Sequence, residues 1–185
     1  LKVAKKHFAE MKQNQIIKKD TNSCYYVYQI KTSSHMQVGF LAVANINMFI
    51  NNIIKGHELT YEDRMNERAD QMLNIDTQVG PIYVTYHDHN KLDDFLFQVT
   101  LSVPQYDFFS FDDSRHTLWC VEDELDKNTL SNLILLINNY YIADGHHRIA
   151  ALKKIFEIKS SQNKNHTGFE GYNYFMISAF PQSKS

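Results

Sequence analysis

The sequence is poor in several residue types, and each shortage excludes a class of protein. It has only 3 Pro and 6 Gly among 185 residues, so it is neither collagen-like nor a low-complexity chain. Its 2 cysteines, Cys24 and Cys120, are far apart and form no CxxC motif. We therefore expect buried free thiols in a reducing cytoplasm, and neither a disulfide framework nor a Cys/His metal site.

The sequence also lacks long apolar runs and an excess of charge of one sign. No segment approaches the length that a membrane span needs, and the first twenty residues lack the apolar core and cleavage site of a signal peptide. The formal net charge of -2 argues against a general nucleic-acid or membrane-surface binder, because binding driven by phosphate charge leaves a basic footprint. We expect a cytoplasmic protein without membrane or nucleic-acid partners, and a local basic pocket stays compatible with this charge.

What remains is an ordinary globular composition, with 43% hydrophobic and 22% charged residues. Helical and strand-like apolar patterns alternate along the chain, and the first two strands are expected to form a hairpin. The expected helices cover residues 3–17, 61–75, 90–100, 123–139 and 146–158, and the expected strands cover residues 24–30, 38–46, 82–86, 116–121, 140–143 and 172–180. This order favours a mixed α/β or α+β fold, in which helices flank a mixed sheet. Thr60 is expected to cap helix 61–75, and residues 159–171 are expected to form a flexible loop.

The segment ADGHHR carries the clearest functional signal. A strand is expected to end at Asp144-Gly145, and a helix to begin with His146, His147 and Arg148. The free N–H groups and the dipole of a helix N-terminus attract anions, and Gly145 lets a ligand approach the backbone. Arg148 has a planar fork suited to phosphate or carboxylate, and both histidines can donate to phosphate or carry a proton. Asp144 can accept a proton or hold a cation.

A purely structural interpretation of ADGHHR would make Asp144 a cap and leave the rest as a solvated first turn. Cations in the first turn oppose the helix dipole, so His-His-Arg there costs stability unless something negative binds. This favours the functional interpretation. A metal site is less favoured, because adjacent histidines point in different directions.

Two other segments carry weaker signals. In KGHELT, Glu58 is either a catalytic carboxylate beside His57 or part of a polar cap before the next helix, and the segment alone favours neither. In SRHTLW, Arg115 and His116 alone would be interpreted as a polar pair on an edge strand beside a core tryptophan.

Taken together, these segments resemble a known family. The ordered set IIKGHELTYEDR, GPIYVTY, RHTLW and YYIADGHHRIAAL is similar to the bacterial and archaeal domain-of-unknown-function family 1015. Because members of that family are longer, the resemblance implies a single domain or the central part of a longer protein. Two positions depart from the family's usual pattern: Ile149 stands where Tyr is frequent, and Ser114 where Gly is frequent.

The family in turn resembles the ParB/sulfiredoxin-like superfamily, which includes kinases of free serine. The resemblance implies a ParB/sulfiredoxin-like core, Mg²⁺ and ATP or ADP as cofactors, and a nucleotide and a small molecule as partners. The implied phosphate-binding residues are Gly145, His146, His147, Arg148, Arg115 and His116. The implied catalytic residues are Glu58 as the base, Asp144, which can also act through Mg²⁺, and His147, with His57, Thr60 and Arg64 in support.

The first hypothesis is therefore a phosphotransferase that acts on a small hydroxyl compound such as free serine. A phosphohydrolase acting on a phosphoserine-like ester would use the same pocket, with His146 or His147 as acid or nucleophile. A non-catalytic nucleotide-binding module is the third alternative. The sequence does not bear on the oligomeric state or on the identity of donor and acceptor.

Overall fold

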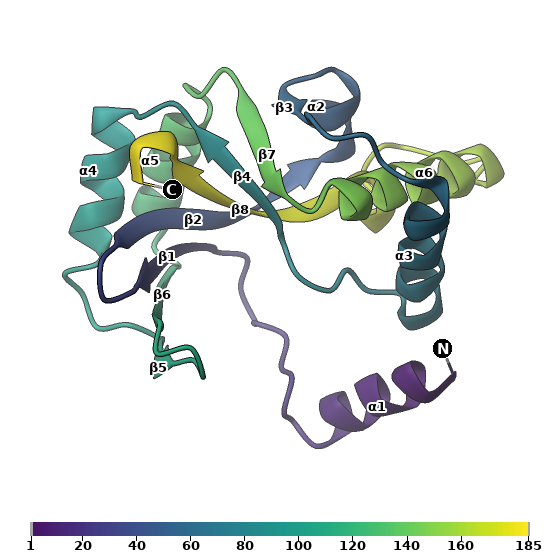
Figure 1. Cartoon of the computed structure of the whole chain (residues 1–185), viewed down its shortest axis with the longest axis horizontal. Helices are drawn as coiled ribbons and strands as arrows, with labels where there is room; N and C mark the ends of the chain where they lie inside the picture. The colour runs from purple at the N-terminus through teal and green to yellow at the C-terminus, as the bar shows by residue number, and fades with distance from the viewer. Residues whose placement is uncertain (1, 185) are drawn as a thin grey trace.

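The computed structural model describes residues 2–184, which form one sheet surrounded by helices (Figure 1). The helices are α1 (Lys2–Gln13), α2 (Ile46–Ile50), α3 (Glu62–Ile75), α4 (Asn90–Val99), α5 (Glu124–Ile134) and α6 (His146–Gln162), with 3-10 turns η1 (Gly171–Asn173) and η2 (Gln182–Lys184). The strands are β1 (Tyr25–Lys31), β2 (Met36–Asn45), β3 (Ile54–Lys55), β4 (Ile82–Tyr86), β5 (Tyr106–Phe109), β6 (Arg115–Val121), β7 (Tyr140–Asp144) and β8 (Tyr174–Pro181).

The sheet has eight strands in the order β3-β7-β4-β8-β2-β1-β6-β5. β3 runs parallel to β7 and β4 runs parallel to β8, whereas the other neighbouring pairs are antiparallel. The mixed sheet that the sequence predicts is therefore confirmed. β1 and β2 form the expected hairpin, whose turn is closed by a 2.8 Å hydrogen bond from Thr32 N–H to the His35 carbonyl.

Helices α4, α5 and α6 bury apolar side chains against the sheet. Leu92 and Leu96 of α4, Leu130 of α5 and Ile149 of α6 belong to the same buried cluster as the inward-facing residues of the strands. The alternation of buried residues along β4, at Ile82, Val84 and Tyr86, is typical of a strand that packs one face on a core. This packing holds the start of α6 firmly at the end of β7.

Helix α3 packs on α6 rather than on the sheet. Ala69 and Met72 of α3 meet Ala151 and Ile155 of α6 in a second, smaller cluster. Figure 1 shows α3 beside the middle of α6, with α1, the helix at the N-terminus, beyond α3. The residues before α3 therefore lie beside the first turn of α6.

The largest errors in the predicted element boundaries are at the ends of three helices, and the other boundaries differ by two residues or fewer. The helix expected at 123–139 ends at Ile134, because Tyr140 already pairs in the sheet and residues 135–139 must connect the two elements. Helix α6 continues to Gln162, so residues 159–162 belong to the helix and not to a loop. The first helix ends at Gln13, four residues before the expected end at Ile17.

The connection after α6 is organised by one carboxylate. Glu170 accepts hydrogen bonds from Thr167 N–H at 2.7 Å, from Gly168 N–H at 3.0 Å and from the Asn173 side-chain amide at 2.9 Å. These donors, led by the Thr167 N–H, lower the pKa of Glu170 to about 2. A charged Glu170 therefore stabilises this segment.

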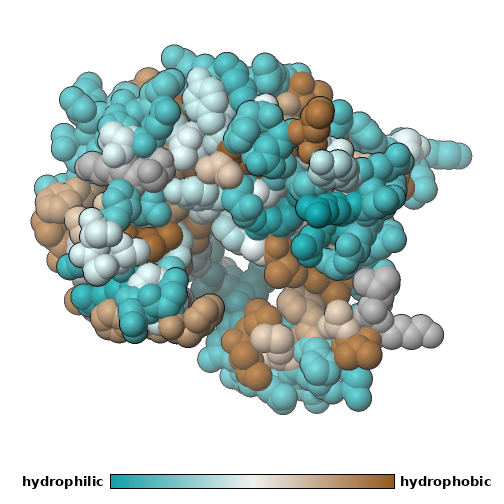
Figure 2. Space-filling model, viewed as in Figure 1, coloured by the Kyte–Doolittle hydropathy of each residue, from teal (hydrophilic) through white to brown (hydrophobic). Residues whose placement is uncertain are grey.

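Both cysteines are free, as expected, but they are half-buried rather than buried. Burial and the neighbouring Cys24 thiol raise the pKa of Cys120. Figure 2 shows that hydrophilic side chains cover most of the visible face and that hydrophobic ones are scattered. Within residues 2–184, no helix combines the length and the apolar character that crossing a bilayer requires.

Candidate functional site

The junction between β7 and α6 has the strand-to-helix geometry that the sequence predicts. β7 ends at Asp144, Gly145 occupies the N-cap position with φ +102°, and His146 opens the helix. An added Cβ at Gly145 would lie 3.1 Å from Ile82 Cδ1 and 3.2 Å from Arg148 Nη2. The junction thus needs glycine both for its backbone angle and for space.

The Arg148 side chain folds back onto this junction. Its Nη1 donates to the Pro81 carbonyl oxygen at 2.5 Å, and its Nη2 forms an ion pair with the Asp144 carboxylate. Asp144 therefore supplies part of the negative charge that the cationic first turn requires. Arg148 is held rigidly by these two contacts, and its orientation is fixed before any ligand arrives.

Glu58 is brought to the same junction by strand pairing. β3 pairs in parallel with β7, with Ile54 opposite Tyr140, so the segment that follows β3 passes over the start of α6. The Glu58 Oε2 atom lies 3.3 Å from Nδ1 of His146. His146 is only 5% exposed, whereas the side chain of Glu58 is 56% exposed and faces solvent.

His146 is held in its neutral form. Burial lowers its pKa, and Glu58 opposes this effect without reversing it. The His57 backbone N–H donates to Nε2 of His146 at 3.4 Å, so the proton of the neutral ring lies on Nδ1, which is 3.3 Å from Oε2 of Glu58. Both ring nitrogens are therefore engaged, and the ring of His57 contacts His146 edge-on at 4.6 Å between centroids.

His147 is anchored to the segment before α3. Its Nε2 accepts a 3.3 Å hydrogen bond from Tyr61 N–H, and its ring stacks on the Tyr61 ring at 6.1 Å. The Arg64 guanidinium lies 5.7 Å from the centroid of the Tyr61 ring, so Arg64 supports this stack. The expected cap at Thr60 is wrong: Tyr61 occupies the N-cap position and makes no side-chain capping bond.

Two cavities meet at the Glu58–His146 pair. The first, which we call the polar cavity, has a volume of about 440 Å³ and is also lined by Asp144, His147, Arg148 and Arg68. The second, which we call the apolar cavity, has a volume of about 640 Å³ and lies between α2 and α6. Apart from Glu58 and His146, its walls include apolar side chains, among them Phe49, Met65, Ile142 and Ile149, and the polar or charged side chains of Asn52, Thr60, Lys153, Lys154 and Glu157. A carboxylate shared by two cavities can contact ligands in both.

Arg115 and His116 lie elsewhere. β6 is five positions from β7 in the sheet order, a distance of roughly 24 Å at the usual strand spacing. Arg115 forms a two-pronged ion pair with Asp107, and His116 bonds to Tyr28 at 2.6 Å and to Ser114 at 2.9 Å. The structure does not bring these two residues to the polar cavity, because their strand belongs to the other half of the sheet.

Arg68 and Lys154 line the cavities but were not singled out in the sequence. Arg68 follows Arg64 by one helical turn, so the two arginines share a face of α3. This spacing in the sequence could have identified Arg68 as a candidate site residue beside Arg64. Lys154 lies on α6 two turns beyond His146, a spacing that is equally visible in the sequence. What the sequence could not reveal is that α3 and α2 approach α6 here.

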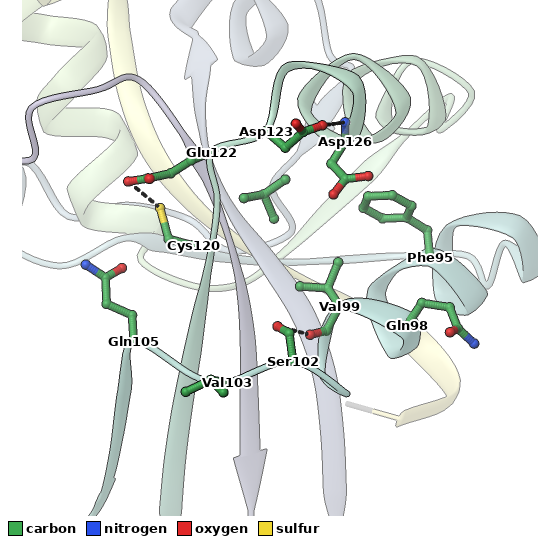
Figure 3. A pocket seen from close by; sticks show the side chains of 11 residues that line it. Phe95, Gln98, Val99, Ser102, Val103, Gln105, Cys120, Glu122, Asp123 and Asp126 are labelled. Carbon is green, nitrogen blue, oxygen red and sulfur yellow. Dashed lines mark hydrogen bonds between the residues drawn. The ribbon is translucent and has the colours of Figure 1, made fainter.

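A further cavity of about 590 Å³ lies at the other end of the sheet (Figure 3). It is lined by Glu122, Asp123 and Asp126 around an apolar wall that includes Phe95 and Val99. Asp123 caps helix α5 by accepting from Leu125 N–H, so this carboxylate already has a structural role. None of the predicted site residues lines this cavity.

Comparison with known proteins identifies a family but no activity. The sequence profile of a family described as "Protein of unknown function (DUF1015)" matches residues 1–185. No curated protein and no solved structure matches the chain. The likeness to ParB and sulfiredoxin therefore remains a prediction, and the candidate function must be argued from the site itself.

Proposed function

Because the chain belongs to the DUF1015 family, whose function is unknown, we propose a function from the geometry of its own site. We propose that the protein is a phosphotransferase that moves a phosphoryl group from a nucleotide to the hydroxyl group of a small molecule. The observation that carries this proposal is the position of Glu58, whose exposed carboxylate lies beside the start of α6 and lines both cavities.

The polar cavity suits the phosphates of the donor. The first N–H groups of a helix have no partner within the helix and point toward an anion. Arg148 is preorganised by the Pro81 carbonyl, and Arg68 adds a second guanidinium. His147 lines the same cavity, and its Nδ1 carries the proton because Nε2 accepts from Tyr61, so His147 is a further donor.

Glu58 is the base of the proposed reaction. The acceptor hydroxyl gives its proton to the Glu58 carboxylate while its oxygen forms a bond to the transferred phosphorus. The bond from that phosphorus to the bridging oxygen of the nucleotide breaks, and its electron pair stays on the leaving phosphate. Arg148, Arg68 and the helix N–H groups stabilise the charge on the phosphate oxygens.

His146 is a positioning residue in this scheme. Its Nδ1 lies 3.3 Å from Oε2 of Glu58, whereas the other carboxylate oxygen, Oε1, lies 4.0 Å from Nε2 of His57 and is the one proposed to accept the proton. Because both ring nitrogens are engaged and the ring is buried, His146 is poorly placed to act as a nucleophile. This favours the phosphotransferase over a phosphohydrolase that uses His146.

The residues present fit Mg²⁺ bound together with a nucleotide. Mg²⁺ is usually held by one or two carboxylates together with phosphate oxygens, and Asp144 and Glu58 line the polar cavity. No group of three or more His, Cys, Asp or Glu side chains within residues 2–184 forms a metal site of its own. Asp144 would hold the ion, which would supply neutralisation of phosphate charge.

The test is an assay of phosphoryl transfer with Mg²⁺, ATP or ADP, and a panel of small alcohols that includes L-serine. We expect a phosphate ester that depends on nucleotide and alcohol, detected by phosphorus NMR and mass spectrometry. Nucleotide binding without transfer to any alcohol would instead identify a binding module. Phosphate release from phosphoserine without nucleotide would favour the phosphohydrolase.

A further inference from the structure

The sheet has two edges, and one of them can accept a further strand. β5 is the last strand in the sheet order and pairs only with β6 within residues 2–184, and Figure 1 shows it on the opposite side of the molecule from α6. The other edge strand, β3, has only two residues, and very short edge strands are protected against pairing with other chains. β5 is longer and contains neither the proline nor the lysine that commonly protects an edge.

The backbone of β5 has free donors and acceptors on its outer side. Ser110 N–H donates to the Ser114 carbonyl oxygen at 2.9 Å, and residues of an antiparallel strand direct their backbone groups alternately to one side and the other. Phe108 therefore points its N–H and C=O toward β6, whereas Asp107 and Phe109 point theirs away from the sheet. Within the described part of the chain, neither the Asp107 N–H nor the Phe109 N–H has a hydrogen-bond partner.

Aromatic residues surround this edge. Four of them have half or more of their surface exposed: Tyr106 (55%), Phe108 (51%), Phe109 (69%) and Phe111 (103%). At about 200 Å² for a whole aromatic side chain, they expose roughly 560 Å² on each copy of the chain, so their burial between two copies would remove up to roughly 1,100 Å² from water. A specific interface needs about 1,000 Å², so the patch reaches the size that a dimer requires.

The charges of this edge are also compatible with a second copy. Asp107 is the one charged residue of β5, and Nε and Nη2 of Arg115 donate to its carboxylate at 2.8 Å and 2.6 Å. The Arg115 guanidinium also lies 5.9 Å from the centroid of the Phe109 ring. A strand that places its own aspartate opposite Phe109 therefore brings a carboxylate toward a cation.

We infer that β5 pairs with β5 of a second copy of this chain, in antiparallel orientation around a two-fold axis at Phe108. Opposite residues of an antiparallel pair face the same side of the sheet, so the axis must pass through a residue. An axis at Phe108 places Asp107 of each copy opposite Phe109 of the other, and each such pair exchanges two backbone hydrogen bonds. An axis at Asp107 would instead set two like charges directly opposite each other.

This inference does not rest on the proposed phosphotransferase function. β5 and β7 lie in different halves of the sheet, so the polar cavity of each copy stays open in the dimer. The two-fold axis also closes the assembly, because each copy uses its β5 edge once. The dimer therefore contains one continuous sheet with a candidate site toward either end.

The first experiment measures the mass of the whole chain in solution. Sedimentation velocity over a series of protein concentrations should show a monomer that converts to a dimer as the concentration rises. A monomer at every concentration would overturn the inference, even if an unrelated extended peptide binds to β5, because the partner would then be of another kind. Growth into species larger than a dimer would overturn it as well, because the two-fold axis leaves no second β5 edge.

The second experiment uses two variants at the axis. Phe108→Lys and Phe108→Glu each place two like charges directly opposite each other, so each should weaken dimerisation about 10-fold or more. In a mixture of the two variants lysine faces glutamate, and the dimer should form about 10-fold more tightly than with either variant alone. Recovery in the mixture also shows that both variants are folded, and a mixture that associates no better than its components contradicts an axis at Phe108.

Phe169→Lys and Phe169→Glu are the matched controls. Phe169 is 84% exposed, but it lies in the segment after α6 and outside β5. Both control variants should dimerise as the wild type does. A dimer that the Phe108 variants leave unchanged, or that the Phe169 variants weaken equally, would place the interface elsewhere and overturn the inference.

Discussion

The Glu58 carboxylate lies 3.3 Å from Nδ1 of His146, although the two residues are far apart in the sequence. They meet because β3 pairs in parallel with β7 and delivers the segment after Lys55 to the first turn of α6. His146 is buried and neutral, and Glu58 is exposed. The pair therefore combines a fixed donor with an accessible acceptor of protons.

Replacement of the base should abolish turnover and preserve the fold. We expect Glu58→Gln to lower kcat about 100-fold or more, because an amide cannot accept the proton of the acceptor hydroxyl. Its side chain has the same size and can still place an oxygen beside Nδ1 of His146, so nucleotide affinity and thermal stability should change little. Glu62→Gln, in the exposed first turn of α3, is the control. Equal activity of Glu58→Gln and the wild type would exclude Glu58 as the base.

The buried His146 should make stability depend on pH. Burial lowers its pKa in the folded protein below the usual 6.5. In the pH window between the lowered pKa and 6.5, the unfolded chain binds a proton at this residue that the folded chain does not bind. The free energy of unfolding should therefore fall as the pH falls from 6.5 toward the lowered pKa. Glu58 and Asp144 favour protonation and narrow this window, whereas His57 and His147 oppose protonation and widen it.

This pH dependence can be measured as a difference between variants. Urea unfolding of the wild type and of His146→Gln, followed from about pH 8 to pH 5, should show the extra slope in the wild type only. His7→Gln on the exposed face of α1 serves as the control for loss of a histidine. A difference between wild type and His146→Gln that stays constant across this range would contradict the assignment.

Much of the fold and the main part of the candidate site could be predicted from the sequence. Apolar periodicity predicted the mixed sheet and its hairpin, and the clash between cations and the helix dipole drew attention to His146, His147 and Arg148. The sequence argument expected a bound anion as the partner of these residues. In the structure, Asp144 and Glu58 of the chain itself lie against Arg148 and His146 and supply part of that negative charge. Local patterns reveal a charge that needs a partner, but not which partner it finds.

Long-range placement could not be predicted. Arg115 and His116 have the right chemistry for phosphate, yet β6 lies in the other half of the sheet, and strand order is not encoded in local periodicity. Thr60 looked like a cap, but the helix start is held by the contact between Tyr61 N–H and His147 instead. Both differences arise from tertiary contacts that override local preference.

Gly145, at the start of α6, should tolerate alanine less well than Gly168, because neighbouring side chains crowd the space that a Cβ would fill. Gly145→Ala should lower the free energy of unfolding by about 1 kcal/mol more than Gly168→Ala. Both positions have positive φ, at +102° and +88°, but only at Gly145 does an added Cβ crowd Ile82 and Arg148. Urea unfolding of the two variants isolates this crowding. Equal destabilisation would mean that the Arg148 side chain adapts without cost.

Arg68, rather than Arg64, should bind the phosphates of the nucleotide. Arg68 lines the polar cavity and donates to the neutral Gln71 side chain at 3.0 Å, whereas Arg64 lies over the Tyr61 ring. We expect Arg68→Ala to weaken ATP or ADP binding about 10-fold in calorimetric titrations at low salt, and Arg64→Ala to weaken it much less. The loss should shrink as salt is added, because an exposed guanidinium is screened. If Arg64→Ala costs as much affinity as Arg68→Ala, the phosphates lie nearer to Tyr61 than the polar cavity implies.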